Sequence, residues 1–196
     1  MTAQAGGASH FPAFLDLRGR RVVVVGGGPV AAAKVETLRA AGAALRVVAP
    51  SVDARIPGHG TVVRERAFRA GDLDGAWFVV AAATPAVNAV VAAEARRRRL
   101  FLNAVDDPAH ATAYLGGVLR RSGVTVAIST DGAAPALAGL LREALDTVLP
   151  RDLGRWLRAA RVERKRWKRS AEPLPRRRPL LLAALNRLYE TREAAR

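Results

Sequence analysis

The chain contains no cysteine and few aromatic residues, and each shortage limits what it can do. Without cysteine, disulfides, zinc–thiolate sites and cysteine nucleophiles are excluded. Aromatic residues make up 5% of the 196 residues, whereas hydrophobic residues as a whole make up 50%. Because alanine, valine and leucine dominate that half, we expect a globular protein with a core of small aliphatic side chains.

Long apolar runs are also missing. The run LLLAAL at residues 180–185 is far shorter than the roughly 20 apolar residues that a transmembrane helix needs. The first residues lack a basic start followed by an apolar stretch, so we expect no signal peptide. We therefore predict a cytoplasmic protein with no membrane partner.

Acidic residues are scarce relative to basic ones, and the formal net charge is +15. Residues 151–196 hold 15 lysines and arginines against 5 acidic residues. Such a field attracts polyanions, which include nucleic acid, an anionic membrane surface and a small polycarboxylate. A solvated basic helix without a specific partner accounts for the charge equally well.

Apolar, β-branched runs alternate with helical patterns along the first two thirds of the chain. The runs predict strands at residues 21–25, 45–50, 61–66, 77–83, 100–105 and 124–130. The helical patterns cover residues 30–41, 85–99, 134–148, 151–169 and 180–193, with a proline-rich break at 170–179. This alternation predicts an α/β fold with a Rossmann-like parallel sheet over residues 1–112. A segment over residues 113–150 and a basic helical C-terminal domain over residues 151–196 follow.

The strongest motif is Gly26-Gly27-Gly28-Pro29-Val30-Ala31, between the first strand and the first helix. It fits G-x-G-x-x-G/A, with Ala31 in the last place. The first glycine permits a tight turn, and the second lets the backbone approach a pyrophosphate. Free N–H groups at the helix start then face the phosphates. The motif therefore predicts a dinucleotide site.

The end of the second strand departs from the usual pattern, which places Asp or Glu there to hold the ribose of NAD. This chain has Pro50 and Ser51, with Asp53 further round the turn. Ser51 can bond the ribose, whereas Arg46 and Arg55 leave NADP open. This rule alone does not decide between NAD and NADP.

Two later turns carry polar residues. Asn103 and Asp106 lie at the end of a buried strand, where ligands bind in open α/β sheets. A carboxylate there suits acid–base chemistry, although spacing alone favours an ordinary polar turn. Ser129 opens the turn before the helix at 134–148, where residue chemistry favours a helix N-cap. His110 is the one histidine close enough to Asp106 to join a site, and the histidines show no metal-ligand spacing, so we predict no bound metal.

Four motifs together resemble the precorrin-2 dehydrogenase family, which also forms the N-terminal part of siroheme synthase. They are GGG-x-VA-x-x-K from Gly26, AAT ending at Thr84, N-x-V-D ending at Asp106, and S-x-x-G-x-x-P-x-L-A-x-x-L-R from Ser129. The resemblance runs in order over about residues 11–155. It implies oxidation of precorrin-2 to sirohydrochlorin with NAD⁺ and, in some members, insertion of Fe²⁺ as a ferrochelatase.

The resemblance also implies roles for particular residues. The glycine loop with Pro29 and Val30 would hold the dinucleotide, Pro50 and Ser51 would meet its adenosine side, and Thr84 would lie near it. Asp106 would be the acid–base residue, and Asn103 and Ser129 would lie near the tetrapyrrole. Members look like homodimers, which makes residues 113–150 the expected dimerisation segment. A polycarboxylate substrate agrees with the basic charge.

Two other functions compete with this one. A regulator that senses NAD and binds nucleic acid would use the basic C-terminal quarter, but no helix-turn-helix precedes the glycine loop. A dehydrogenase of another small anionic substrate would use the same glycine loop. We predict the tetrapyrrole dehydrogenase, without a nucleic-acid partner.

Overall fold

The computed structural model describes residues 10–193 and divides into two compact units, which meet between Leu115 and Gly116. The domain limits at residues 112 and 150 stay predictions. The start of the chain, which bears on the expectation of no signal peptide, lies outside the described residues. A separate dimerisation segment over residues 113–150 stays a prediction, because those residues mostly belong to the second unit.

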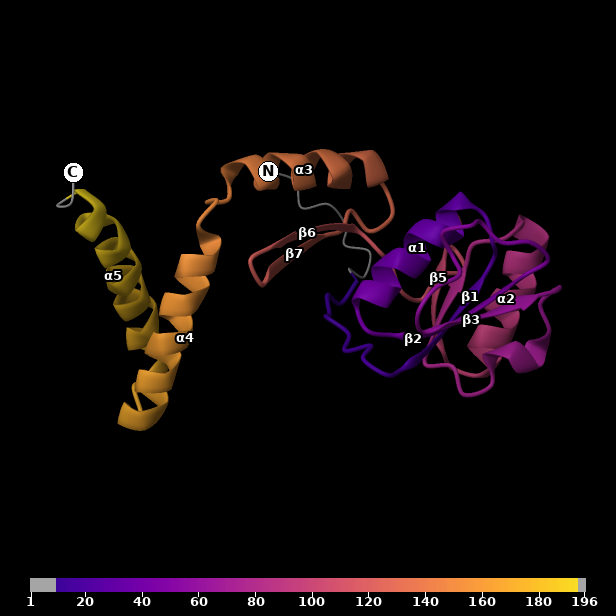
Figure 1. Cartoon of the computed structure of the whole chain (residues 1–196), viewed down its shortest axis with the longest axis horizontal. Helices are drawn as coiled ribbons and strands as arrows, with labels where there is room; N and C mark the ends of the chain where they lie inside the picture. Colours follow the sequence, from indigo (N-terminus) through magenta and orange to yellow (C-terminus); the bar gives the residue numbers. More distant parts are fainter. Residues whose placement is uncertain (1–9, 194–196) are drawn as a thin grey trace, which may run out of the picture. The chain divides into compact units, whose positions relative to one another are not determined.

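The first unit contains a sheet of five parallel strands in the order β3-β2-β1-β4-β5 (Figure 1). This order confirms the predicted Rossmann-like fold. Because the chain returns from β3 to β4 on the other side of β1, a crevice forms at the carboxyl ends of β1 and β4. The strands are β1 (Arg21–Val25), β2 (Ala44–Ala49), β3 (Thr61–Glu65), β4 (Phe78–Ala81) and β5 (Phe101–Ala104).

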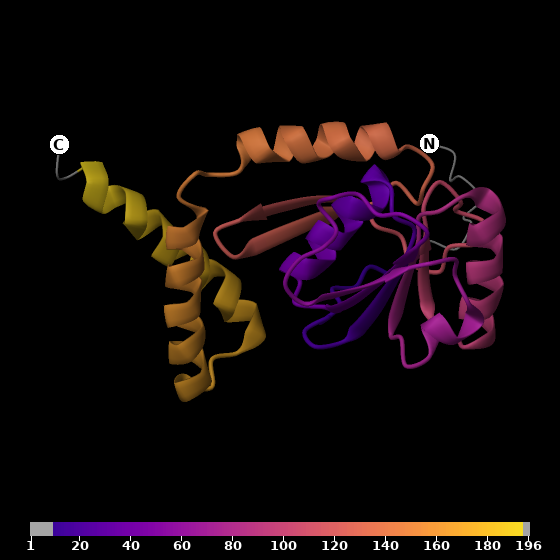
Figure 2. The ribbon, with the colours of Figure 1, turned by 45° about the vertical axis from the view of Figure 1, so that its right-hand side comes forward.

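Helices cover both faces of this sheet (Figure 2). In β1, Val22 and Val24 pack into the core beneath α1, whereas Val23 and Val25 pack into the core beneath α2. A strand that is buried on both faces needs apolar side chains at successive positions. The sequence of β1, RVVVV, meets this requirement. The helices are α1 (Pro29–Ala40), the short 3₁₀ helix η1 (Ala70–Leu73) and α2 (Pro85–Arg97).

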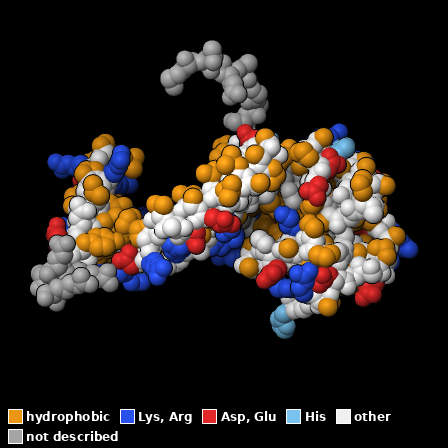
Figure 3. Space-filling view, turned by 90° about the horizontal axis from the view of Figure 1, so that it is seen from above, with side chains coloured by type: hydrophobic (Ala, Val, Ile, Leu, Met, Phe, Trp, Pro, Cys, Tyr) orange, Lys and Arg blue, Asp and Glu red, His pale blue; other side chains and the backbone are white. Residues whose placement is uncertain are grey.

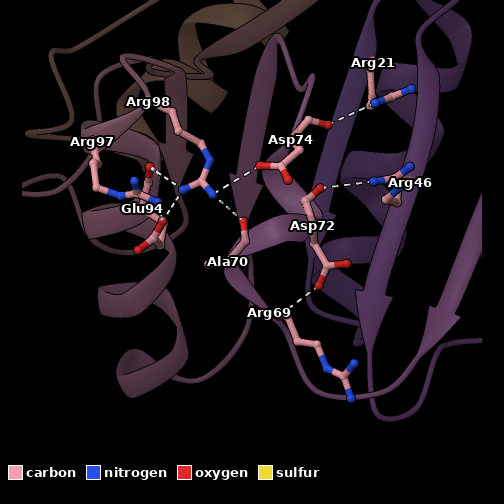
Figure 4. A network of polar contacts seen from close by, with 9 residues as sticks. All are labelled: Arg21, Arg46, Arg69, Ala70, Asp72, Asp74, Glu94, Arg97 and Arg98. Carbon is pink, nitrogen blue, oxygen red and sulfur yellow. Dashed lines mark hydrogen bonds and ion pairs between the residues drawn. The ribbon is translucent and has the colours of Figure 1, made fainter.

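A polar network ties α2, η1 and β1 together at the end of the sheet opposite the crevice (Figure 4). The Arg98 guanidinium donates to the Ala70 carbonyl (2.9 Å) and to Asp74 (3.2 Å) and pairs with Glu94. Arg21 donates to the Asp74 carbonyl across 3.0 Å. Part of the basic charge at the end of α2 therefore has a structural role, because Arg98 links this helix to η1 and to the turn that follows η1.

Asp72 in η1 is the buried carboxylate beside this network. Asp72 is 5% exposed. Its two carboxylate oxygens accept hydrogen bonds from the two terminal nitrogens of Arg66 (2.6 and 2.8 Å), and Oδ2 also accepts one from the Arg69 backbone N–H (2.8 Å). The Arg66 side chain is one third exposed. These hydrogen bonds lower the pKa of Asp72, and those from Arg66 have the largest effect. Burial acts in the opposite direction, because it disfavours the charged form.

We expect Asp72→Ala to lower the free energy of unfolding by about 2–3 kcal/mol at pH 7, less than for a fully buried pair because Arg66 is partly solvated. A carboxyl with a lowered folded pKa stabilises above its unfolded pKa of about 4, and this contribution is lost as the pH falls. Urea unfolding of both proteins across this range should show the deficit shrinking below about pH 4. Asp16→Ala, which removes an exposed ion pair, is the control.

The second unit begins with an antiparallel hairpin of β6 (Gly117–Arg121) and β7 (Val124–Ile128). β7 confirms the strand at 124–130, but it pairs with β6 and not with the parallel sheet. The sequence analysis missed β6, because GGVLRR lacks a clear alternation. Both glycines are needed there: a Cβ on Gly116 would lie 1.9 Å from the Ile128 carbonyl oxygen, and one on Gly117 would lie 2.9 Å from that of Ala138.

Three helices follow: α3 (Pro135–Val148), α4 (Leu153–Ser170) and α5 (Leu174–Glu193). The predicted beginning of the last helix at residue 180 is wrong. α4 ends at Ser170, its C-cap residue Ala171 adopts the left-handed conformation, and α5 begins at Leu174. Its first turn tolerates Pro175, whose missing N–H has no helical partner there, and Pro179 lies inside the helix. Among the helices of residues 10–193, none combines the length and the apolar composition of a membrane span.

Candidate dinucleotide and substrate site

The glycine loop forms one wall of a cavity of about 600 Å³ at the carboxyl ends of β1, β2 and β4. Every residue predicted to hold the cofactor lines this cavity except Val30, which lines its neighbour. Ser51 lies two residues beyond the end of β2, and Thr84 is the N-cap residue of α2. The structure therefore brings together residues that are up to about 60 positions apart in the chain.

The three glycines have different surroundings. Gly26 has φ +131°, and a Cβ on it would lie 2.2 Å from the Ala82 carbonyl oxygen. A Cβ on Gly27 would lie 1.9 Å from the Ser51 carbonyl oxygen. A Cβ on Gly28 would meet no described atom within 4 Å. The first two glycines are thus required by the protein itself, whereas Gly28 leaves room for a ligand.

The helix start beyond Gly28 suits an anion. Gly28 is the N-cap residue, no side chain of the described residues caps it, and Pro29 begins the helix. The first amide groups of a helix lack partners within it and lie at the positive end of its dipole. Together with the open space over Gly28, these amides fit the pyrophosphate of a dinucleotide.

Asp53, which the sequence places further round the turn after the second strand, also lines this cavity. Its backbone N–H donates to the Gly27 carbonyl across 2.7 Å, and its side chain is 19% exposed. Hydrogen bonds from the Arg55 side chain, then from its backbone, hold the pKa of Asp53 well below its usual range. Arg46, the other arginine that left NADP open, instead donates to the Asp72 carbonyl (Figure 4).

A second cavity of about 350 Å³ adjoins the first and shares Ala82 and Ala83 with it. Asp106, Asp107 and Val30 line this second cavity. Asp106 lies two residues beyond the end of β5, after Val105, whose amide donates to the Ala81 carbonyl (2.9 Å), and it has φ +56°. The predicted acid–base carboxylate thus lies beside the predicted dinucleotide cavity.

Asn88 is a residue that the sequence analysis missed. It lies on α2 with 5% exposure, and its Oδ1 accepts the Ala83 amide across 3.0 Å. Ala83 belongs to the turn that both cavities share, so Asn88 holds that turn in place. A signal was present, because Asn88 occupies the same buried helical stripe as Val91 and Ala95.

His110 contacts the neighbouring carboxylate. Its Nδ1 lies 2.7 Å from Asp107 Oδ2, and the side chain is 46% exposed. The carboxylate of Asp107 therefore already has a side-chain partner, His110, at the second cavity. Among the described residues 10–193, no three His, Asp or Glu side chains gather as metal ligands.

The two predicted substrate residues have different places. Asn103 is buried in β5, donates from Nδ2 to the Ala113 carbonyl (3.0 Å) and has an Oδ1 without a partner among the described residues. Ser129 belongs to the second unit, where its Oγ accepts the Asp131 amide (3.1 Å). The predicted N-cap is wrong, because Ala134 caps α3 and the hydroxyls brace the preceding turn. The roles of Asn103 and Ser129 at a substrate stay predictions.

Comparisons with known proteins agree with this geometry. A family model of NAD(P)-binding domains matches residues 13–117. The siroheme synthase of Pseudomonas entomophila is 43% identical over 150 residues, which cover 74% of this chain and 32% of that protein. The siroheme synthase of Photorhabdus laumondii is 36% identical over 190 residues, which cover 90% and 39%. The chain therefore spans between about a third and two fifths of the length of these relatives.

A solved structure is also similar. It is SirC, a precorrin-2 dehydrogenase, with a TM-score of 0.72 and 28% sequence identity. The similarity covers 89% of this chain and 88% of that one.

Proposed function

We propose that this chain, which belongs to the family of NAD(P)-binding domains, is a precorrin-2 dehydrogenase that oxidises precorrin-2 to sirohydrochlorin with NAD⁺. The similarity to siroheme synthases and to SirC supports the substrate. One observation carries the proposal: a cavity with an open glycine loop adjoins a cavity with an exposed carboxylate, Asp106.

The chemistry requires a hydride acceptor and a base. Oxidation removes one hydride and one proton from the macrocycle, and NAD⁺ when bound accepts the hydride. Gly28 and the amides of the α1 N-terminus hold the pyrophosphate, and Asn88 fixes the turn between the two cavities. Asp106 accepts the proton from the substrate carbon, because it is the carboxylate in the second cavity that has no ion-pair partner among the described residues.

An anaerobic incubation with precorrin-2 and NAD⁺ tests this function. We expect the absorption spectrum of sirohydrochlorin and one NADH for each precorrin-2 consumed. If the protein binds NAD⁺ but leaves precorrin-2 untouched, it is a dehydrogenase of another anionic substrate or a nucleotide-sensing regulator. Adding Fe²⁺ afterwards tests the ferrochelatase activity, in which Fe²⁺ is a substrate and Asp106 and Asp107 are the nearby carboxylates.

We also propose that the chain forms a homodimer, and the exposed hydrophobic face of α3 supports this. Hydrophobic side chains gather over this helix in the space-filling view (Figure 3). Leu137 (48% exposed), Leu140 (63%), Leu141 (43%) and Val148 (78%) recur at helical spacing along one face. A soluble chain rarely leaves such a stripe open, so a second copy is the expected partner.

Leu140→Glu should turn the dimer into a monomer, because it places a charge inside an apolar interface. Sedimentation velocity at several concentrations measures this directly. Val162→Glu places the same charge at an exposed valine of α4, outside this stripe, and is the matched control that should stay dimeric. A wild-type monomer would refute the dimer. The cytoplasmic location and the absence of a nucleic-acid partner stay predictions.

A further inference from the structure

The chain contains two Asp-x-Arg turns with the same three hydrogen bonds. In one, Asp53 Oδ1 accepts the Arg55 backbone N–H (3.0 Å) and Nε (2.9 Å), and Oδ2 accepts Nη2 (2.7 Å). In the other, the corresponding distances from Arg18 to Asp16 are 3.2, 2.8 and 2.6 Å. Asp53 lines the larger cavity, whereas Asp16 lines neither of the two described cavities. The same ion pair thus exists at the candidate site and away from it.

Asp53 occupies the place where a dinucleotide site meets the adenosine ribose. It follows β2, which itself ends in Ala49 and offers no carboxylate there. Its amide is bonded to Gly27, so the turn from β2 lies directly on the glycine loop. Among the described residues that line this cavity, Asp53 is the one with a charged side chain. In Rossmann-like folds, the polar group after the second strand determines whether a ribose with a 2′-hydroxyl (NAD) or with a 2′-phosphate (NADP) is bound.

We propose that the Asp53–Arg55 pair selects NAD over NADP at this site. A carboxylate offers about four lone-pair positions, and Arg55 uses two on Oδ1 and one on Oδ2. One position on Oδ2 is left to accept a ribose hydroxyl. A 2′-phosphate in its place would meet the negative carboxylate, and the guanidinium that could bind that phosphate is already engaged.

Arg55 could itself bind a 2′-phosphate if Asp53 did not hold its guanidinium. The Arg55 side chain is 63% exposed, and Asp53 is what holds it. If the carboxylate is removed, the guanidinium is free to bind a phosphate with its paired donors. Serine at position 53 keeps a small group that bonds hydroxyls and lacks the negative charge. Asp53→Ser should therefore move the preference toward NADP, and the gain should depend on Arg55.

This inference rests on the proposed dinucleotide site, and calorimetric titration with NAD⁺ and with NADP⁺ tests it without any turnover. We expect the wild-type protein to bind NAD⁺ at least about tenfold more tightly than NADP⁺. Asp53→Ser should shift the ratio of the two dissociation constants by about 100-fold toward NADP⁺, and the Asp53→Ser/Arg55→Ala double variant should lose the gain in NADP⁺ affinity. Asp16→Ser, which breaks the matching pair elsewhere, should leave the ratio unchanged.

Each contrary outcome has a distinct meaning. If Asp53→Ser binds the two nucleotides in the wild-type ratio, the pair does not select the cofactor, and the proposed dehydrogenase function stands. A shift of the same size in Asp16→Ser would show a general effect of charge and would also overturn the inference. If the wild-type protein binds neither nucleotide, the proposed function fails and the inference fails with it. Thermal unfolding of each variant identifies any that do not fold.

Discussion

Replacing Asp106 by asparagine is expected to slow precorrin-2 oxidation by about 10²- to 10⁴-fold, the usual contribution of a positioned general base. Asparagine has the same shape but cannot accept the proton at neutral pH. It also tolerates the left-handed backbone at this position, where φ is +56°, so the variant should fold normally. Anaerobic turnover measured by NADH formation, together with the affinity for NAD⁺, separates lost chemistry from lost binding.

Asp107→Asn is the matched control for this experiment. Asp107 lines the same cavity, but its carboxylate is paired with His110 across 2.7 Å. We expect a much smaller loss of rate than for Asp106→Asn, and an unchanged affinity for NAD⁺. If the two variants exchanged their effects, Asp107 with His110 would be the base. If both retained full activity, neither carboxylate would take the proton.

The parts of the fold that the sequence predicted are those in which local pattern and burial agree. β1 is apolar on both faces because α1 and α2 cover both, and the run RVVVV shows this directly. The hairpin partner β6 could not be predicted in the same way. Gly116 and Gly117 are required by the close approach of β7 and α3, and glycine in a strand weakens the pattern that identifies one.

The candidate site was predicted where one short segment carries the chemistry. The glycine loop needs small residues at consecutive positions, and this requirement is visible in the sequence. The places of Asp53 and Asn88 depend instead on how a turn folds back: Asp53 reaches the cavity because its amide bonds Gly27, and Asn88 acts through the Ala83 amide. Neither contact follows from spacing along the chain.

The last prediction compares two glycines of the loop: Gly26, which is crowded by the protein, and Gly28, which faces open space. Gly28→Ala should lower the affinity for NAD⁺ by about 10- to 100-fold and leave the thermal midpoint unchanged, because its Cβ meets no described protein atom within 4 Å but would enter the space proposed for the pyrophosphate. Its φ of −79° is open to alanine. Calorimetry with NAD⁺ and thermal unfolding measure the two effects separately.

Gly26→Ala is the contrasting variant. Its Cβ would lie 2.2 Å from the Ala82 carbonyl oxygen at a φ of +131°, so we expect a loss of about 3 kcal/mol in the free energy of unfolding. Both variants add a single methyl group within one loop, two residues apart. If Gly28→Ala bound NAD⁺ as tightly as the wild-type protein, the pyrophosphate would not lie over this loop. The open face of Gly28 would then need another explanation than a ligand.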